Sequence, residues 1–127
     1  MGDDGLVIDV SRAEFEELVG EALDSIPEEF TRIMDNVVVL VDDYPPDGRR
    51  ILGLYEGVPL TERGQGYTFA LPDKITIFQR PIEARCGQNG DRIAAEIARV
   101  VRHEIAHHFG ISDERLDELE RLRGEQE

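Results

Sequence analysis

One short stretch of the chain, residues 103–113, contains all three histidines together with acidic residues that could bind a metal ion or transfer protons. His103 and His107 are four positions apart, so on an α-helix their side chains share one face, with Cβ atoms roughly 5–6 Å apart. Two imidazoles placed in this way can bind one zinc ion at about 2.0–2.1 Å. Glu104 follows the first histidine, where its carboxylate could act as general base toward a zinc-bound water. The spacing therefore predicts a zinc site on a helix.

The residues that follow the second histidine indicate a catalytic zinc site. Gly110 stands three residues after His107, where a helix can end in the left-handed conformation. Asp113 comes after this turn, so its carboxylate can return toward the two histidines. Two nitrogens and one oxygen leave a fourth position for water, which is the arrangement of catalytic rather than structural zinc. Asp117 or Glu118, one helical turn further on, are the alternative third ligands.

The full motif, H-E-x-x-H-x-x-G-x-x-D, has the spacing of the metzincin motif with aspartate in place of the third histidine. From about Val37 onward the chain resembles the small bacterial zincin-like metallopeptidases, also called minimal zincins. The resemblance rests on three segments: LGLYEGVPLTERG at 52–64, LPD at 71–73, and the run from His103 through Asp113 to Leu116 and Leu119. It implies a compact zincin core and a zinc hydrolase. A Met-turn is absent, because the methionines are Met1 and Met34.

The composition predicts one soluble globular domain over residues 1–127. The 28 acidic and 14 basic residues give a formal net charge of -14, which repels nucleic-acid phosphates and anionic lipids, so we expect neither as a partner. The N-terminus lacks a positively charged leader and no apolar run is long enough to span a membrane, so we expect a cytoplasmic protein. Cys86 is the single cysteine, which excludes an internal disulfide and is interpreted as an ordinary unpaired thiol.

Together with its flanking segments, the motif is predicted to form an α+β fold, a minimal zincin-like core with a sheet of three or four strands. Residues 11–24 are predicted to form an amphipathic helix that starts with a capping box of Ser11 and Glu14. A short helix after Pro27 is expected to bury its apolar side, which comprises Phe30, Ile33 and Met34. The β-branched run 37–41 predicts a well-buried strand. Two further strands are expected at 51–56 and 74–80.

The motif helix is predicted to start near Asn89 or Asp91 and to pack on the sheet. At ~100° per residue its apolar residues fall within one arc, namely Ile93, Ala94, Ile97, Ala98, Val101, Ile105 and Phe109. The two motif histidines point away from this arc. His108 falls inside it, so we interpret His108 as a buried, hydrogen-bonded core residue. In the last helix, which Ser112 caps, three leucines at i, i+3 spacing are expected to pack: Leu116, Leu119 and Leu122.

The connection from Gly57 to Asp73 is long for a domain of this size, and long loops in compact domains are often functional. Tyr67 could donate a phenolic hydrogen bond to a reaction intermediate, and Arg63 could hold a substrate carboxylate. A packed loop aromatic and a surface arginine are the alternative interpretations. We therefore treat both residues as candidates for substrate binding.

These observations lead to the hypothesis of a zinc-dependent metallopeptidase that acts on a peptide or protein substrate with one zinc ion per chain. The metal would be bound by His103, His107 and Asp113, while Glu104 would act as general base and then as proton donor to the leaving amine. The family resemblance adds an exposed sheet edge that binds an extended peptide. The alternative is a metal-containing zincin-fold binding module with little or no proteolytic activity, because a chain of this size offers only a shallow cleft.

Overall fold

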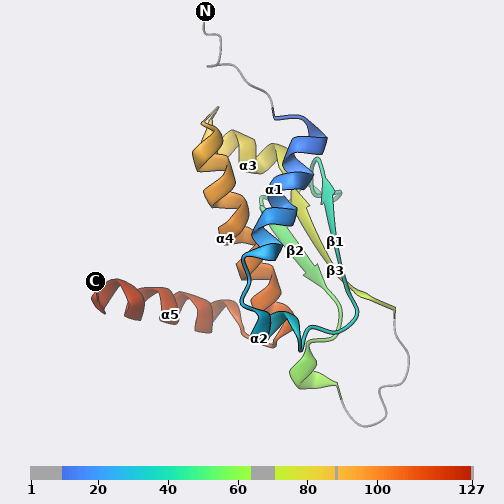
Figure 1. Ribbon diagram of the computed structural model, residues 1–127, viewed down its shortest axis with the longest axis vertical. Helices are drawn as coiled ribbons and strands as arrows, with labels where there is room; N and C mark the ends of the chain where they lie inside the picture. Colours follow the sequence, from blue (N-terminus) through green and yellow to red (C-terminus); the bar gives the residue numbers. More distant parts are fainter. Residues whose placement is uncertain (1–9, 64–70, 88, 127) are drawn as a thin grey trace, which may run out of the picture.

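The computed structural model describes residues 10–63, 71–87 and 89–126. Within them a three-stranded sheet has the strand order β1-β3-β2, and helices α1, α3 and α4 lie on one side of it (Figure 1). Strand β1 (Val37–Asp42) runs parallel to β3 (Asp73–Phe78), with Val37 opposite Asp73. Strand β2 (Gly53–Glu56) runs antiparallel to β3, with Gly53 opposite Ile77. Because β2 lies at the end of the strand order, only one of its edges pairs with β3.

Strand β1 is half-buried on one face and exposed on the other, so the prediction of a well-buried strand was wrong. Its residues alternate in exposure, and Val38 and Leu40 are 40% and 47% exposed. The helices cover a single face of the sheet (Figure 1). A continuous β-branched run therefore places every second side chain on the uncovered face. The run predicted the strand but not its one-sided burial.

Helix α1 (Arg12–Asp24) starts as the sequence predicts. The Ser11 hydroxyl accepts the Glu14 N–H at 3.0 Å, and the Glu14 carboxylate accepts the Ser11 N–H at 3.0 Å, which confirms the capping box. Phe15 and Val19 then face the core. The short helix α2 (Glu28–Thr31) and the residues after it differ in part from expectation: Phe30 and Ile33 are 44% and 58% exposed, whereas Met34 packs against the core.

Helix α3 (Gln79–Cys86) was not predicted. Strand β3 ends at Phe78, and the chain continues directly into this helix, although the sequence pattern extended the strand to Arg80. Pro81 is the third residue of α3, within the first turn, where a missing backbone N–H breaks no intrahelical hydrogen bond. Pro81 is therefore compatible with the start of α3 and does not only mark the end of β3. Cys86, the last residue of α3, is a buried free cysteine.

Helix α4 (Gly90–His108) carries the motif and is the centre of the fold. The Asn89 side chain caps it by accepting the Arg92 N–H at 3.1 Å, as predicted. The helix packs against α1, α3, β2 and β3 and supplies five of the residues of the hydrophobic core, namely Ile93, Ile97, Val100, Val101 and Ile105. Each fully buried side chain of this size contributes roughly 1.5–3 kcal/mol. This burial fixes which face of α4 points away from the core.

Helix α5 (Asp113–Gln126) projects from the body of the molecule (Figure 1). Ser112 caps it by accepting the Arg115 N–H at 3.2 Å. The predicted packing of its leucines was wrong for Leu119 and Leu122, which are 39% and 42% exposed, whereas Leu116 is half-buried. The helix leaves the body within its first turns (Figure 1), so in the described part of the chain no layer lies opposite the two exposed side chains. Across the described residues, no helix is both long and apolar enough to cross a membrane.

Candidate functional site

The two motif histidines lie side by side near the C-terminal end of α4. Their ring centroids are 4.9 Å apart and the rings meet edge to face. Because Val101 and Ile105 face the core, His103 and His107 point into a cleft, where their side chains are 29% and 21% exposed. The helical spacing of the motif therefore produces the predicted pair of neighbouring imidazoles.

The turn after α4 returns the chain toward these histidines. Gly110 has a φ of 88°, in the left-handed region that favours glycine. The Gly110 N–H donates to the His107 carbonyl at 2.9 Å, and the Ile111 N–H donates to the Ala106 carbonyl at 2.9 Å. These two bonds form a Schellman motif. Helix α5 starts three residues after the glycine, so the turn determines where its first residue lies.

The first residue of α5 is Asp113, and its carboxylate lies against both histidines. Its Oδ1 is 2.9 Å from His103 Nε2 and 3.0 Å from His107 Nε2. The three side chains offer ligand atoms that all lie within 4.8 Å of one another. Asp117 and Glu118, the alternative third ligands, are outside this group, and Glu118 pairs with Arg115 instead. The structure thus brings together the three residues that the motif spacing indicates.

The chemistry of this donor set fits zinc. His107 Nδ1 lies 2.9 Å from the carbonyl oxygen of Ile111. A carbonyl can only accept, so Nδ1 carries the proton and the lone pair of a neutral imidazole is on Nε2, the nitrogen that faces Asp113. Metal-binding histidines commonly use this kind of hydrogen bond on the second nitrogen. Two imidazole nitrogens and one carboxylate oxygen form a three-ligand set of the type found at catalytic zinc.

Glu104 lies beside the histidines in a confined position and is only 7% exposed. Burial raises the pKa of its carboxyl above the ordinary value, while the neighbouring His103 and His107 act in the opposite direction. Strand β2 passes close by: a Cβ at Gly53 would be 3.2 Å from Glu104 Oε2 and 2.7 Å from Val100 Cγ1. A raised pKa brings a carboxylate closer to the range in which a general base works best at neutral pH.

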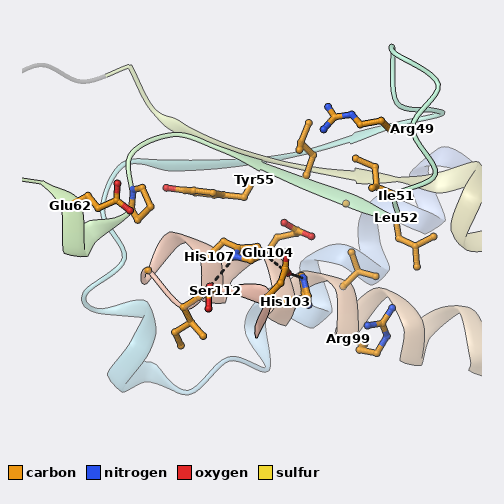
Figure 2. A pocket seen from close by; sticks show the side chains of 17 residues that line it. Arg49, Ile51, Leu52, Tyr55, Glu62, Arg99, His103, Glu104, His107 and Ser112 are labelled. Atoms are coloured by element: carbon orange, nitrogen blue, oxygen red, sulfur yellow. Dashed lines mark hydrogen bonds and ion pairs between the residues drawn. The ribbon is translucent and has the colours of Figure 1, made fainter. Parts of the chain in front are cut away.

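A cleft of about 600 Å³ lies between β2 and α4 and contains these groups. In Figure 2, Arg49, Ile51 and Leu52 lie at one end and Glu62 at the other. The residues of the motif line the cleft between these ends. Gly53, Leu54 and Tyr55 of β2 form the opposite wall. The edge of the sheet therefore borders the candidate metal centre.

The two predicted substrate-binding residues have different outcomes. Tyr67 lies outside the described residues. Arg63 is described, but it does not line the cleft: its side chain is 8% exposed and forms ion pairs with Asp73 at 2.9 Å and Asp35 at 3.1 Å. The structure therefore places Arg63 in a buried polar cluster and not as a surface arginine or beside the metal ligands.

Tyr55 is a cleft residue that sequence reasoning did not single out. Its ring centroid is 6.5 Å from that of His107, and its hydroxyl donates to Asp73 Oδ2 at 2.5 Å. Burial, followed by the hydrogen bond to Asp73, raises the pKa of the phenol above its ordinary value. Since Gly53 and Tyr55 are two residues apart in a strand, they share one face. That spacing was the signal that could have placed Tyr55 next to the site.

His108 is a buried core residue, as predicted. It is 0% exposed, with Nδ1 2.9 Å from Asp73 Oδ2. Its Nε2 accepts the backbone N–H of Asp35 at 3.3 Å, so the proton is on Nδ1. Both ring nitrogens are used within the protein. His108 therefore cannot serve as a metal ligand without breaking this arrangement.

Comparisons with known proteins agree with the fold. Residues 34–122 match the zincin-like metallopeptidase family. A solved structure, a conserved hypothetical protein from Thermo thermophilus, is similar to 91% of this chain and 99% of its own, with 27% identity and a TM-score of 0.53. No curated protein matches. The predicted α+β fold with a small zincin-like core is confirmed. With the family match spanning more than half of its length, the chain is a member of the zincin-like metallopeptidase family.

Proposed function

We propose that the protein is a zinc-dependent peptidase that binds one zinc ion per chain and uses Glu104 as its general base. The observation that carries the proposal is the convergence of His103, His107 and Asp113 within 4.8 Å in a cleft, beside a buried carboxylic acid. A structural zinc site would satisfy its metal with four protein ligands, whereas three ligands at a cleft leave a position for a substrate or water.

Zinc bound by this donor set would supply a Lewis acid that polarises a peptide carbonyl and acidifies a water molecule. The protein's own groups move the protons. Glu104, whose pKa is raised by burial, takes a proton from the attacking water and then gives it to the leaving amine. General-base action of this kind typically contributes about 10²–10⁴-fold in rate. The narrow space between Glu104 and Gly53 limits the positions that the carboxylate can take.

The edge of β2 supports a peptide as the substrate. This strand pairs with β3 on one side and borders the cleft on the other through Gly53, Leu54 and Tyr55. An extended peptide can add to such an edge by main-chain hydrogen bonds, with little dependence on its side chains. A peptide bound along β2 would lie across the cleft from the motif residues, which is the placement that hydrolysis requires.

A binding module that keeps the metal centre but cleaves little is the second candidate. The exposure of Asp113 favours it, because 73% of this side chain is accessible. An open ligand is poorly shielded from water, and closed, dry sites strengthen the electrostatic interactions on which catalysis depends. In this case the cleft would hold a peptide or protein segment without hydrolysing it.

The deciding experiment compares the wild type with Glu104→Gln. Glutamine has nearly the same shape as glutamate but cannot accept the proton, so zinc content should be unchanged and cleavage of a broad peptide library should disappear. Glu96→Gln is the matched control: Glu96 lies two turns earlier on α4 and is paired with Arg85 and Arg99. It should keep activity. Equal cleavage by the wild type and Glu104→Gln would refute the role of Glu104, and zinc-loaded wild type that captures library peptides without cleaving any would favour the binding module.

A further inference from the structure

Four residues next to the candidate metal centre form a closed ring of polar contacts, in which Asp35 takes part through both its backbone N–H and its carboxylate. His108 Nδ1 donates to Asp73 Oδ2 at 2.9 Å, and His108 Nε2 accepts the Asp35 N–H at 3.3 Å. Arg63 closes the ring, with Nη1 3.1 Å from Asp35 Oδ2 and Nη2 2.9 Å from Asp73 Oδ2. The ring thus joins the end of α4, the start of β3, the turn before β1 and the segment after β2.

Three of the four residues of the ring are buried, and this burial makes the loss of any of their contacts costly. Asp73 is 1% exposed and His108 is 0% exposed, and the Arg63 side chain is 8% exposed. A buried carboxylate or guanidinium that loses its partner carries an uncompensated charge, which costs far more than an exposed ion pair contributes. The four segments are therefore held in one relative arrangement.

The Arg63 guanidinium donates hydrogen bonds through Nε and Nη1, and its Nη2 contacts Asp73 as an ion pair. Nε donates to the Val58 carbonyl at 2.9 Å, while Nη1 and Nη2 reach Asp35 and Asp73. A planar guanidinium presents its donors in a fixed fork, whereas a lysine ammonium is a single point charge. Arg63 therefore fixes the direction of the segment 58–63, and not only its distance from the core.

The segment 58–63 packs against the Gly110 turn, which leads to the proposed third ligand, Asp113. In η2 (Leu60–Glu62), Thr61 packs against Gly110 so closely that a Cβ on the glycine would be 2.1 Å from Thr61 Oγ1 and 2.8 Å from Thr61 Cγ2. Gly110 in turn leads into Asp113. The position of Thr61 therefore limits where the Asp113 carboxylate can lie.

The ring also holds the groups that lie on both sides of His107, the second proposed histidine ligand. His108, a ring member, is the direct neighbour of His107 in α4. Tyr55 donates its hydroxyl to Asp73 at 2.5 Å, and its ring centroid lies 6.5 Å from that of His107. Asp73 thus holds groups on both sides of this ligand: the following residue on the helix and the tyrosine that faces it from β2.

We propose that Arg63 is a positioning residue of the metal centre, which holds the segment 58–63 against the Gly110 turn and so keeps the Asp113 carboxylate opposite His103 and His107. This inference rests on the proposed zinc site. It assigns Arg63 a role that acts through the ligands, in place of direct contact with a substrate carboxylate.

The test compares Arg63→Met and Arg63→Lys with the wild type. Arg32→Met is the matched control, because Arg32 has a 73% exposed side chain and pairs only locally with Glu28 across one helical turn. Zinc affinity is measured by competition with a chromophoric chelator, and the visible spectrum of the cobalt-substituted protein reports ligand geometry.

Arg63→Met should weaken zinc binding by about 10- to 100-fold, the range for residues that orient metal ligands, and should change the cobalt spectrum. Arg63→Lys should fall between it and the wild type, and Arg32→Met should equal the wild type.

Three results would overturn the inference. Folded Arg63→Met with unchanged zinc affinity and cobalt spectrum would leave Arg63 only a role in stability. A raised KM with unchanged zinc affinity would make Arg63 a substrate-binding residue. If Arg63→Met does not fold, Arg63→Lys decides by the same two readouts, and wild-type affinity and spectrum in that variant would refute the requirement for the guanidinium fork.

Failure of the proposed zinc site is a separate outcome. It would appear as wild-type protein that binds no zinc. Even then, amide hydrogen exchange in the metal-free proteins tests the ring, because the N–H groups of Gly110 and Ile111 are hydrogen-bonded in the turn. Exchange at these two amides should be faster in Arg63→Lys than in the wild type and in Arg32→Met. Equal exchange would show that Arg63 does not hold the turn.

Discussion

Gly53 and Glu104 approach each other so closely that β2 leaves no room for a side chain above the acid. A Cβ at position 53 would be 3.0 Å from Glu104 Cγ, 3.2 Å from Glu104 Oε2 and 2.7 Å from Val100 Cγ1. The edge strand and the candidate base are therefore fitted to each other. Any residue other than glycine at this position must displace the acid, the valine or the strand.

We expect Gly53→Ala to lower the free energy of unfolding by about 1–3 kcal/mol, the usual cost of overpacking, and to lower kcat/KM while zinc still binds. The matched control is Gly20→Ala in α1, where an added Cβ would meet nothing within 4 Å and should stabilise the helix by roughly 0.5–1 kcal/mol. Urea unfolding and a zinc titration measure these effects. If Gly53→Ala keeps the stability and activity of the wild type, β2 can shift to accommodate a Cβ at position 53 without measurable cost.

The ligand set predicts a ranking of zinc affinities. Because both imidazoles and one carboxylate converge, His103→Ala and His107→Ala should each abolish stoichiometric binding, and Asp113→Ala should weaken it strongly. Asp117→Ala, which alters a residue one turn further along α5, should bind as the wild type does. A metal titration on protein freed of metal gives the ranking. Loss of binding in Asp117→Ala with retention in Asp113→Ala would move the third ligand further into α5.

Asp73 should make the stability of the metal-free protein depend on pH in the acidic range. Burial alone would raise its pKa, but hydrogen bonds from Tyr55, His108 and Val58 and the charge of Arg63 hold the pKa below the ordinary value of 3.8. The unfolded chain then binds a proton before the folded one does, so the contribution of Asp73 is present above about pH 4 and is lost as the pH falls below it. Urea unfolding between pH 3 and pH 6 should give a shallower pH dependence for Asp73→Asn. An unchanged slope would contradict this linkage.

Glu104 should have the opposite effect on the metal-free protein. Burial, the largest influence, raises its pKa above 4.5, so the unfolded chain releases the proton at lower pH than the folded protein does. Stability is therefore lost as the pH rises from about 4.5 through the folded pKa. Glu104→Gln has no carboxyl group that ionises at this position. The free energy of unfolding of this variant, relative to that of the wild type, should therefore increase from pH 4 to pH 7. A constant difference over this range would mean that the ionised carboxylate is well solvated.

The local signals in the sequence were sufficient to predict the motif helix and the convergence of His103, His107 and Asp113. The caps at Ser11, Asn89 and Ser112 depend on side chains within three residues of the backbone groups that they satisfy. The pair of histidines follows from helical periodicity alone, and the left-handed Gly110 follows from the absence of a Cβ. Interactions of this range are encoded within one segment, so a pattern in the sequence predicts them.

The features that the sequence did not predict depend on what lies opposite an element. The exposed Leu40, Leu119 and Leu122 have apolar patterns typical of buried residues, and only the arrangement of layers decides that none of the described helices and strands covers them. Arg63 has the same difficulty, because its partners Asp35 and Asp73 lie 28 and 10 positions away. Charge alone made it a plausible substrate ligand. Its burial, which follows from the folded arrangement, gives it a different role.

The position of Asp113 at the first residue of α5 joins the chemistry of the site to the attachment of a whole helix. Because α5 projects from the body (Figure 1), its orientation is determined largely at the end where this carboxylate lies. A ligand that binds Asp113 together with His103 and His107 also anchors the helix, and any change in the helix's direction must be opposed by the binding energy of that ligand. Binding of a metal ion at the candidate centre should therefore also restrict the direction of α5, so the orientation of this helix should report whether the site is occupied.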